Sequence, residues 1–108
     1  MAKKLGQQTV CLTRDIYILA AGSAVGKKEG EGPLGRCFDS VDGDDTFGQD
    51  SWEKAESALQ REAFTRALDK AGMSPSQVNY LFAGDLLNQN VASTFGLREY
   101  NVPLFGQF

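Results

Sequence analysis

The sequence predicts an α/β fold in which helices cover a mostly parallel sheet. Predicted strands and helices alternate along the chain, and this alternation favours right-handed crossovers between parallel strands. The run from Ile16 to Ala21 is continuously apolar, as in a strand that is covered on both faces. The stretch from Asp50 to Ala71 has apolar residues at three- and four-residue steps, which is typical of a helix with one face on a sheet.

Two short strands are predicted near the N-terminus. Residues 9–12 and 16–21 are β-branched, aromatic or apolar, and polar residues separate the two runs. The region 22–50 is predicted to be one long loop without regular elements, because it is rich in glycine up to Gly35 and acidic from Asp39 onward. A loop of this length in a compact domain is usually functional or disordered.

The clearest helix begins at Asp50, whose carboxylate is positioned to cap free N–H groups while Glu53 reaches back as in a capping box. Its apolar stripe starts at Trp52 and continues mainly through alanines, which permit close packing. Gly72 is placed to end the helix in the left-handed conformation. Pro75 then opens a single short turn, at the first helical position.

A strand over 78–83, a helix over 91–100 and a strand over 102–105 complete the alternation. The last strand has nothing visible to cover it, so we expect residues 1–108 to be a fragment of a larger domain that is cut off at Phe108. Such a fragment leaves a sheet edge and a helix face uncovered. We therefore predict that the isolated chain oligomerises or stays partly molten, and a sharp, concentration-independent melting transition of a monomer would contradict this.

The composition argues against several classes of protein. The 108 residues suit one domain, and a formal charge of -3 with a pI near 4.8 makes nucleic acid a poor partner. The sequence shows neither a signal peptide nor a membrane-spanning run, so synthesis in the cytoplasm is expected. Histidine is absent, so catalysis by this chain alone would need another general base. Cys11 and Cys37 are too few and too far apart for a disulfide framework or a metal site.

Two familiar ligand-binding motifs are matched only in part. Residues 22–28 resemble a phosphate-binding loop, but the spacing is one residue short, no Ser or Thr follows the lysine, and residues 29–33 replace the helix that would complete the site. Residues 42–53 place acids near the ligand positions of a calcium-binding EF-hand loop, but Phe47 stands where glycine is needed. A solvated acidic loop is the better interpretation, and we predict no metal or cofactor.

The segment 83–90 is the strongest candidate site. It follows a predicted strand, and ligands of open α/β sheets favour the C-terminal ends of strands. Asp85, Asn88, Gln89 and Asn90 supply a carboxylate and three amides, which accept and donate hydrogen bonds. The same residues also suit turn and N-cap chemistry for the following helix, and spacing alone favours that alternative.

Two segments carry a resemblance to a known family. Residues 21–35, which are followed by Cys37-Phe38-Asp39, and residues 82–91, with the sequence Ala-Gly-Asp-Leu-Leu-Asn-Gln-Asn, closely resemble the opening region of the stage V sporulation protein AD family. The helix start at 51–53 and the apolar end at 102–106 occur in the same order as in that family. The resemblance covers essentially the whole chain.

The resemblance implies a partial thiolase-like fold, the start of the first of two similar α/β halves. It also implies a non-catalytic sporulation protein that binds dipicolinic acid (pyridine-2,6-dicarboxylate), free or as its calcium chelate, and takes part in its uptake into the developing spore. We expect Asp85, Asn88, Gln89 and Asn90 to line or support the binding site. Other stage V sporulation membrane proteins are expected partners, with the protein peripheral at the spore inner membrane, and a homo-oligomer is also expected.

Two other hypotheses stay open. One is an acyltransferase of the thiolase or ketoacyl synthase type, whose nucleophilic cysteine and histidines would lie beyond Phe108. Neither Cys11 nor Cys37 matches that cysteine in the family's pattern, so neither inherits its role. The other is an interaction module that docks on a membrane protein through the acidic loop 39–50 and the apolar C-terminus.

Overall fold

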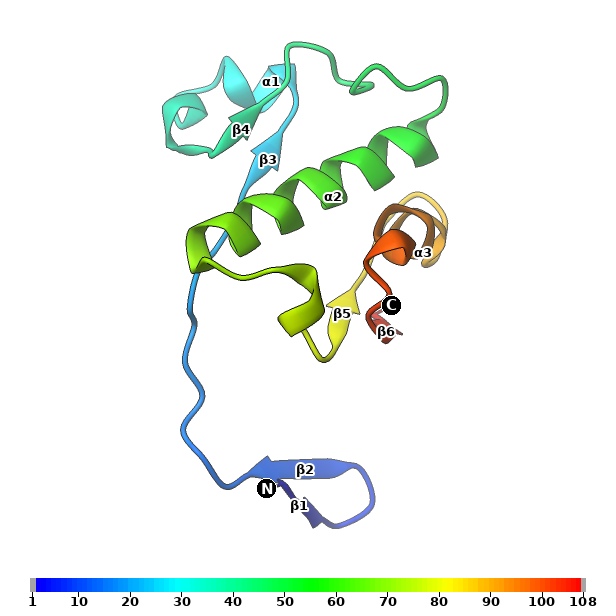
Figure 1. The fold of residues 1–108 in the computed structure, drawn as a ribbon. Coiled ribbons are helices and arrows are strands. Elements are labelled where there is room, and N and C mark those ends of the chain that lie inside the picture. Colours follow the sequence, from blue (N-terminus) through cyan, green and yellow to red (C-terminus); the bar gives the residue numbers. More distant parts are fainter. Residues whose placement is uncertain (1, 108) are drawn as a thin grey trace.

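The computed structural model describes residues 2–107, which form a mixed α/β arrangement around one long helix (Figure 1). The strands are β1 (Ala2–Leu5), β2 (Thr9–Leu12), β3 (Ala24–Val25), β4 (Ser40–Val41), β5 (Leu81–Ala83) and β6 (Leu104–Gly106). The helices are α1 (Lys27–Gly30), α2 (Trp52–Ala71) and α3 (Val91–Leu97), with short 3-10 helices η1 (Gly35–Cys37), η2 (Pro75–Gln77) and η3 (Arg98–Tyr100). The described strands pair as three separate two-stranded sheets, so the single sheet that the alternation predicted is not formed among them.

The N-terminal strands form a hairpin that stands apart from the other elements in Figure 1. The strand predicted at residues 9–12 is confirmed as β2, and its partner is β1, in antiparallel register with Lys3 opposite Cys11. Gly6 turns the chain between them with φ 65°, a left-handed angle that suits glycine. Every residue of both strands is exposed, so the hairpin buries no core face of its own.

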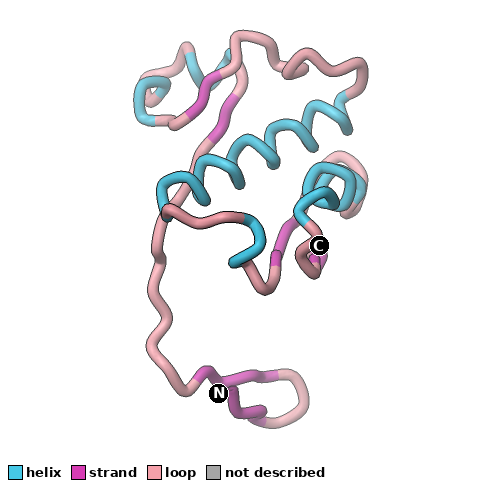
Figure 2. The backbone as a smooth tube through the Cα atoms, in the orientation of Figure 1, coloured by secondary structure: helices cyan, strands magenta, loops and turns pink. Residues whose placement is uncertain are grey.

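The strand predicted over residues 16–21 is wrong. This stretch is irregular in the structure, and Figure 2 shows it as part of the loop that joins the hairpin to β3. Ile18 is 92% exposed and Leu19 is 72% exposed, so the middle of the apolar run is not buried by residues 2–107. A strand requires a neighbour for its backbone N–H and C=O groups, and no described strand lies beside this one to supply it.

The prediction of an unbroken loop over residues 22–50 is also wrong, because short regular elements form there. β3 and β4 pair in parallel, with Ala24 opposite Ser40, and α1 and η1 lie between them in the chain. Glycine makes this compactness possible: a Cβ built on Gly35 would lie 1.9 Å from the carbonyl oxygen of Gly30. The Lys27 backbone N–H at the start of α1 donates to Asp45 Oδ1 at 2.8 Å, so a carboxylate of the chain itself occupies the motif that resembled a phosphate loop.

The acidic turn before α2 is held by its own carboxylates. Both oxygens of Asp44 accept hydrogen bonds, from the N–H and hydroxyl of Thr46 and from the N–H of Gly48. These bonds lower the pKa of Asp44, first through the backbone of Thr46. Within residues 2–107, no three Asp, Glu or Cys side chains are arranged to hold a metal ion.

The N-cap of helix α2 lies one residue later than predicted. Ser51 is the N-cap, and its hydroxyl accepts a hydrogen bond from the Lys54 N–H at 3.2 Å. Asp50 instead forms an ion pair with the ammonium of Lys54, and Glu53 accepts a bond from Asn88 rather than closing a capping box. Trp52, which the apolar stripe placed in the core, is 61% exposed. The buried face of α2 is formed further along the helix, by Ala55 and Leu68.

The predicted end of α2 is confirmed. Gly72 has φ 65° and ψ 31°, and its N–H donates to the Asp69 carbonyl at 3.1 Å while the Met73 N–H donates to the Leu68 carbonyl at 3.0 Å. The turn at residues 74–77 is also confirmed as η2, in which the backbone N–H of Ser74 donates to Gln77 Oε1 at 2.9 Å.

We predict that Gly72→Ala lowers the free energy of unfolding by about 1 kcal/mol, because a Cβ is strained in the left-handed conformation. Urea denaturation followed by circular dichroism measures the change. Gly43→Ala is the matched control, since Gly43 lacks this backbone conformation and a Cβ there meets no atom within 4 Å. Equal stability of both variants would show that the conformation of Gly72 carries no cost.

The C-terminal half supplies the core. β5 and β6 pair in parallel, with Leu81 opposite Leu104, and α3 with η3 forms the crossover between them, as the sequence predicted for residues 78–105. α2 lies against α3 on one side and against β3 on the other. The buried apolar side chains are few and come from these elements: Ala55, Leu68, Leu81, Ala92 and Leu97.

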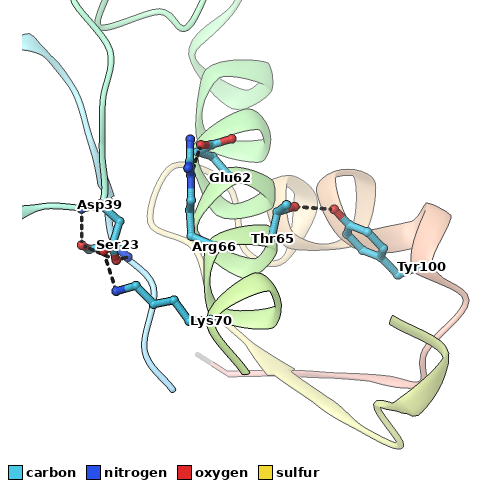
Figure 3. A network of polar contacts seen from close by, with 7 residues as sticks. All are labelled: Ser23, Asp39, Glu62, Thr65, Arg66, Lys70 and Tyr100. Carbon is cyan, nitrogen blue, oxygen red and sulfur yellow. Dashed lines mark hydrogen bonds and ion pairs between the residues drawn. The ribbon is translucent and has the colours of Figure 1, made fainter. Parts of the chain in front are cut away.

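A polar network fastens the N-terminal segments to the C-terminal half of α2 (Figure 3). Asp39 Oδ2 accepts hydrogen bonds from the backbone N–H and the hydroxyl of Ser23, at 2.9 and 3.1 Å. The ammonium of Lys70 pairs with Asp39 and also donates to the Ala21 carbonyl at 3.1 Å. The hydrogen bond from Lys70, followed by the backbone bond from Ser23, lowers the pKa of Asp39 below its ordinary value of 3.8.

We predict that Asp39→Asn lowers the melting temperature at pH 7 and that the difference from the parent chain fades as the pH falls. Because the folded-state pKa of Asp39 lies below its unfolded value, its contribution to stability is complete above the unfolded pKa and is lost as the pH falls through the folded pKa. Melting curves between pH 7 and about pH 3 measure this. A difference between the two chains that stays constant across that range would contradict the role of the Asp39 charge.

Candidate functional site: a groove between α2 and α3

The loop after β5 is organised by Asp85. Its Oδ1 accepts a hydrogen bond from the Asn90 N–H at 2.8 Å, and its Oδ2 accepts bonds from the N–H and hydroxyl of Ser93 at 2.9 and 2.8 Å. Ser93 is fully buried on α3. Asp85 therefore stabilises the first turn of α3, which is the turn and capping role that spacing alone favoured for this segment.

The electrostatic state of Asp85 follows from these contacts. Desolvation raises its pKa, but the hydrogen bonds from Ser93 and Asn90 outweigh that effect, so the pKa of Asp85 is lowered overall. The side chain is thus a carboxylate at neutral pH, and its two oxygens face donors of the chain itself. A ligand-binding role for Asp85 is indirect in this geometry, through the shape of the loop.

Asn88 turns toward α2 and not toward the end of the sheet. Its side-chain N–H donates to Glu53 Oε1 at 2.9 Å. The neighbouring loop is fixed to the same helix, since Glu56 accepts from the N–H of Leu86 at 3.0 Å and from that of Leu87 at 3.4 Å. Gln89, the next residue in the chain, is exposed.

Asn90 is strained and half-buried. It adopts φ 61°, which is uncommon outside glycine, and its Oδ1 is a buried oxygen with no hydrogen-bond partner among residues 2–107. Its amide lies against β6, because a Cβ built on Gly106 would lie 2.2 Å from Asn90 Nδ2. The four predicted residues are therefore brought into one loop, but they do not converge on a common point.

A groove with a volume of about 450 Å³ lies beside this loop, between the first half of α2 and α3. Its apolar wall consists of Ala58, Val91 and Phe95. Its charged residues are Glu53, Lys54, Arg61 and Arg98. Asn88 borders the groove through its bond to Glu53, and Val91 directly follows the predicted segment.

The two helices approach closely enough to form the floor of this groove. A Cβ built on Gly96 would lie 2.8 Å from the Ser57 carbonyl oxygen, so only glycine permits the observed contact. The Ser57 hydroxyl donates to the Ala92 carbonyl at 2.8 Å, and Arg61 Nε donates to the Gly96 carbonyl at 3.0 Å. Further along α2, Thr65 and Tyr100 are joined by a hydroxyl hydrogen bond of 3.2 Å (Figure 3).

The sequence interpretation missed the basic residues of the groove. Lys54 and Arg61 lie outside the apolar stripe of α2, and their seven-residue spacing puts them on one side of a helix. Arg98 follows Phe95 by three residues, and its guanidinium carbon lies 5.1 Å from the centre of the Phe95 ring. The spacing was readable in the sequence, but the meeting of the two helices was not.

These features define a small α/β protein with a cation-lined groove between two helices. The family model for stage V sporulation protein AD matches residues 6–108, and the chain belongs to this family. It is 39% identical over 106 residues to the stage V sporulation protein AD of Bacillus subtilis (strain 168), an alignment that covers 98% of this chain and 31% of that protein. The chain therefore spans about a third of the length of that relative. Among residues 2–107, no helix is both long and apolar enough to cross a membrane.

Proposed function

We propose that the protein binds dipicolinic acid and takes part in its uptake into the developing spore. The observation that carries the proposal is the groove between α2 and α3, in which three cations stand beside an apolar wall. Dipicolinate at neutral pH is a flat aromatic dianion, and such a ligand requires donors for its carboxylates and apolar area for its ring. Membership of a sporulation protein family supports the biological setting.

We further infer that this chain contributes binding and not catalysis. Its 108 residues contain no histidine, and its two cysteines are both exposed free thiols. Peripheral association with other stage V sporulation membrane proteins belongs to the same proposal. The acidic loop 39–50 is a weaker docking element than its composition suggested, because Asp39, Asp44 and Asp45 all accept hydrogen bonds from the chain itself.

Titration calorimetry with dipicolinate tests the binding function. We expect saturable binding of dipicolinate, with weaker binding of benzoate, which has a flat aromatic ring of similar size but one carboxylate. Calcium added at equal concentration shows whether the free acid or the chelate is preferred. Absence of saturable dipicolinate binding by the folded chain would overturn the proposal.

The candidate loop residues support the site and do not contact the ligand directly in this proposal. Asn88→Ala removes the donor that holds Glu53, and the freed carboxylate at the groove then repels an anion. We expect dipicolinate affinity to fall by about fivefold, or roughly 1 kcal/mol. Asn90→Gly, which keeps the left-handed backbone, is the companion variant. If calorimetry gave unchanged affinity for the double variant, these side chains would be scaffolding only.

A further inference from the structure

The cations of the α2–α3 groove have hydrogen-bonding capacity that the chain leaves unused. The guanidinium of Arg98 has five N–H donors, and within residues 2–107 this group forms neither a hydrogen bond nor an ion pair. Its described contact is the stacking on the Phe95 ring. Arg61 uses Nε for both the Gly96 carbonyl and Glu99 Oε1, which leaves its terminal nitrogens to other partners. A cationic group with free donors beside an aromatic ring is a favourable partner for a carboxylate.

The third cation is held only loosely by its ion pair. Lys54 Nζ lies 2.7 Å from Asp50 Oδ1, in an i,i+4 pair whose side chains are 61% and 76% exposed. Exposed pairs of this kind contribute little and exchange readily with solvent or ligand. The ammonium also retains donors beyond the one that Asp50 uses.

Glu53 is the one acidic residue among those that line the groove, and one of its oxygens accepts a hydrogen bond from a residue outside the lining. Glu53 Oε1 accepts the Asn88 amide at 2.9 Å. The remaining lining is neutral or cationic, with Gln49, Ser51 and Ser57 as polar groups and Val91 and Phe95 as apolar ones. The formal charge of the lining residues is therefore positive, in a chain whose formal net charge is -3.

We propose that the α2–α3 groove is a dicarboxylate-binding site in which Arg98 and Lys54 engage the two carboxylates of a planar aromatic ligand, Phe95 and Val91 contact its ring, and Arg61 ties the two walls together. The inference rests on the proposed function for its choice of ligand, and it assigns that function to residues outside the loop 85–90. Arg61 is a positioning residue here, because its described contacts join α2 to α3 and η3.

The test is calorimetric titration of the full chain with dipicolinate, using Arg98→Gln and Lys54→Gln. We expect the Kd to rise about tenfold for Arg98→Gln and about threefold for Lys54→Gln, since a bidentate guanidinium contact is stronger than that of an exposed ammonium. Arg36→Gln is the matched control: Arg36 is exposed on η1, away from the groove, and its loss should change the Kd less than twofold. Circular dichroism of each variant verifies that the fold is retained.

A second measurement makes the result independent of small stability changes. Carbon-13 methyl and aromatic NMR signals of Val91 and Phe95 are expected to shift on addition of dipicolinate in the parent chain, and in Arg98→Gln to shift only at about tenfold higher dipicolinate concentration. Arg98→Lys, which keeps the charge but not the planar fork, should give an intermediate Kd. Equal affinity of the parent chain, Arg98→Gln and Lys54→Gln would overturn the inference, as would equal weakening by Arg36→Gln.

Three ligands separate failure of the groove from failure of the proposed function. If the groove variants leave dipicolinate binding unchanged, the groove is not the binding site, but the proposed dipicolinate-binding function of the chain stands. Equal, Arg98-dependent binding of dipicolinate and isophthalate, with no preference for the pyridine ring, supports the groove and refutes a dipicolinate-specific function. Tighter binding of an acidic peptide than of either small acid would overturn the assignment of the groove to a small dicarboxylate.

Discussion

Gly96→Val is expected to lower the free energy of unfolding by about 3 kcal/mol, because overpacking against α2 outweighs the better helix propensity of valine relative to glycine. The first atom of any side chain at this position would lie 2.8 Å from the Ser57 carbonyl and 3.1 Å from its Cα, both on the backbone of α2. Backbone atoms cannot rotate away as a flexible side chain can, so the helices must separate. The two hydrogen bonds that cross at this point, from Ser57 and Arg61, would lengthen with them.

Urea denaturation of Gly96→Val against Thr94→Val measures this effect. Thr94 is exposed on the same helix, so its substitution tests valine in α3 without a contact to α2. Because the same approach of the helices forms the groove, Gly96→Val should also weaken dipicolinate binding in conditions where the chain is still folded. Equal unfolding free energies for the two variants would show that a larger side chain at position 96 fits between α2 and α3 without separating them.

Asp85→Ala is the second substitution with a large expected effect, a loss of about 3 kcal/mol of stability. The alanine would leave three donors without an acceptor, and two of them belong to Ser93, which is fully buried. Unpaired buried donors cost more than the hydrogen bond itself contributes. The first turn of α3 would lose its anionic partner at the same time.

The pH dependence distinguishes this role from simple packing. The pKa of Asp85 is lowered in the folded chain, so its contribution is present above the unfolded-state pKa and disappears as the pH falls through the folded-state pKa. Asp85→Asn keeps the size and one acceptor oxygen, and it should be less harmful than alanine at pH 7. Gln89→Ala, an exposed position in the same loop, should leave stability nearly unchanged. If Asp85→Ala also left stability unchanged, the carboxylate would not be what holds α3.

Features set by neighbouring residues were predictable from the sequence, and features set by distant ones were not. The left-handed end of α2 at Gly72 and the turn at Pro75 depend on a few consecutive residues, and both were predicted correctly. The cap of α2 was misplaced by one residue, because Asp50 and Ser51 are both good caps and the ion pair with Lys54 engages Asp50. The local sequence is compatible with a cap at either Asp50 or Ser51, and only the three-dimensional structure shows which residue caps α2.

Composition alone also failed where strand pairing decides the outcome. The run Ile16–Ala21 has the residues of a buried strand but pairs with no strand among residues 2–107, while Ala24–Val25, in a glycine-rich stretch, pairs with β4. Asp85, Asn88 and Asn90 were identified as a group because they are close in sequence. Their directions, toward Ser93, Glu53 and β6, depend on elements more distant along the chain, as does the groove that they border.

The extended residues 13–23 also determine how the hairpin can move. Figure 1 shows the hairpin joined to the rest of the chain only through them, and this tether is held at Ala21 by the hydrogen bond from Lys70 and at Ser23 by the hydrogen bonds to Asp39. We expect the hairpin to reorient as a unit about this tether, on a nanosecond to microsecond scale for such a segment. Nuclear spin relaxation should therefore show residues 2–12 tumbling apart from α2. A partner that binds the exposed apolar residues of the tether, residues 13–23, would stop that motion and change the apparent size of the molecule in solution.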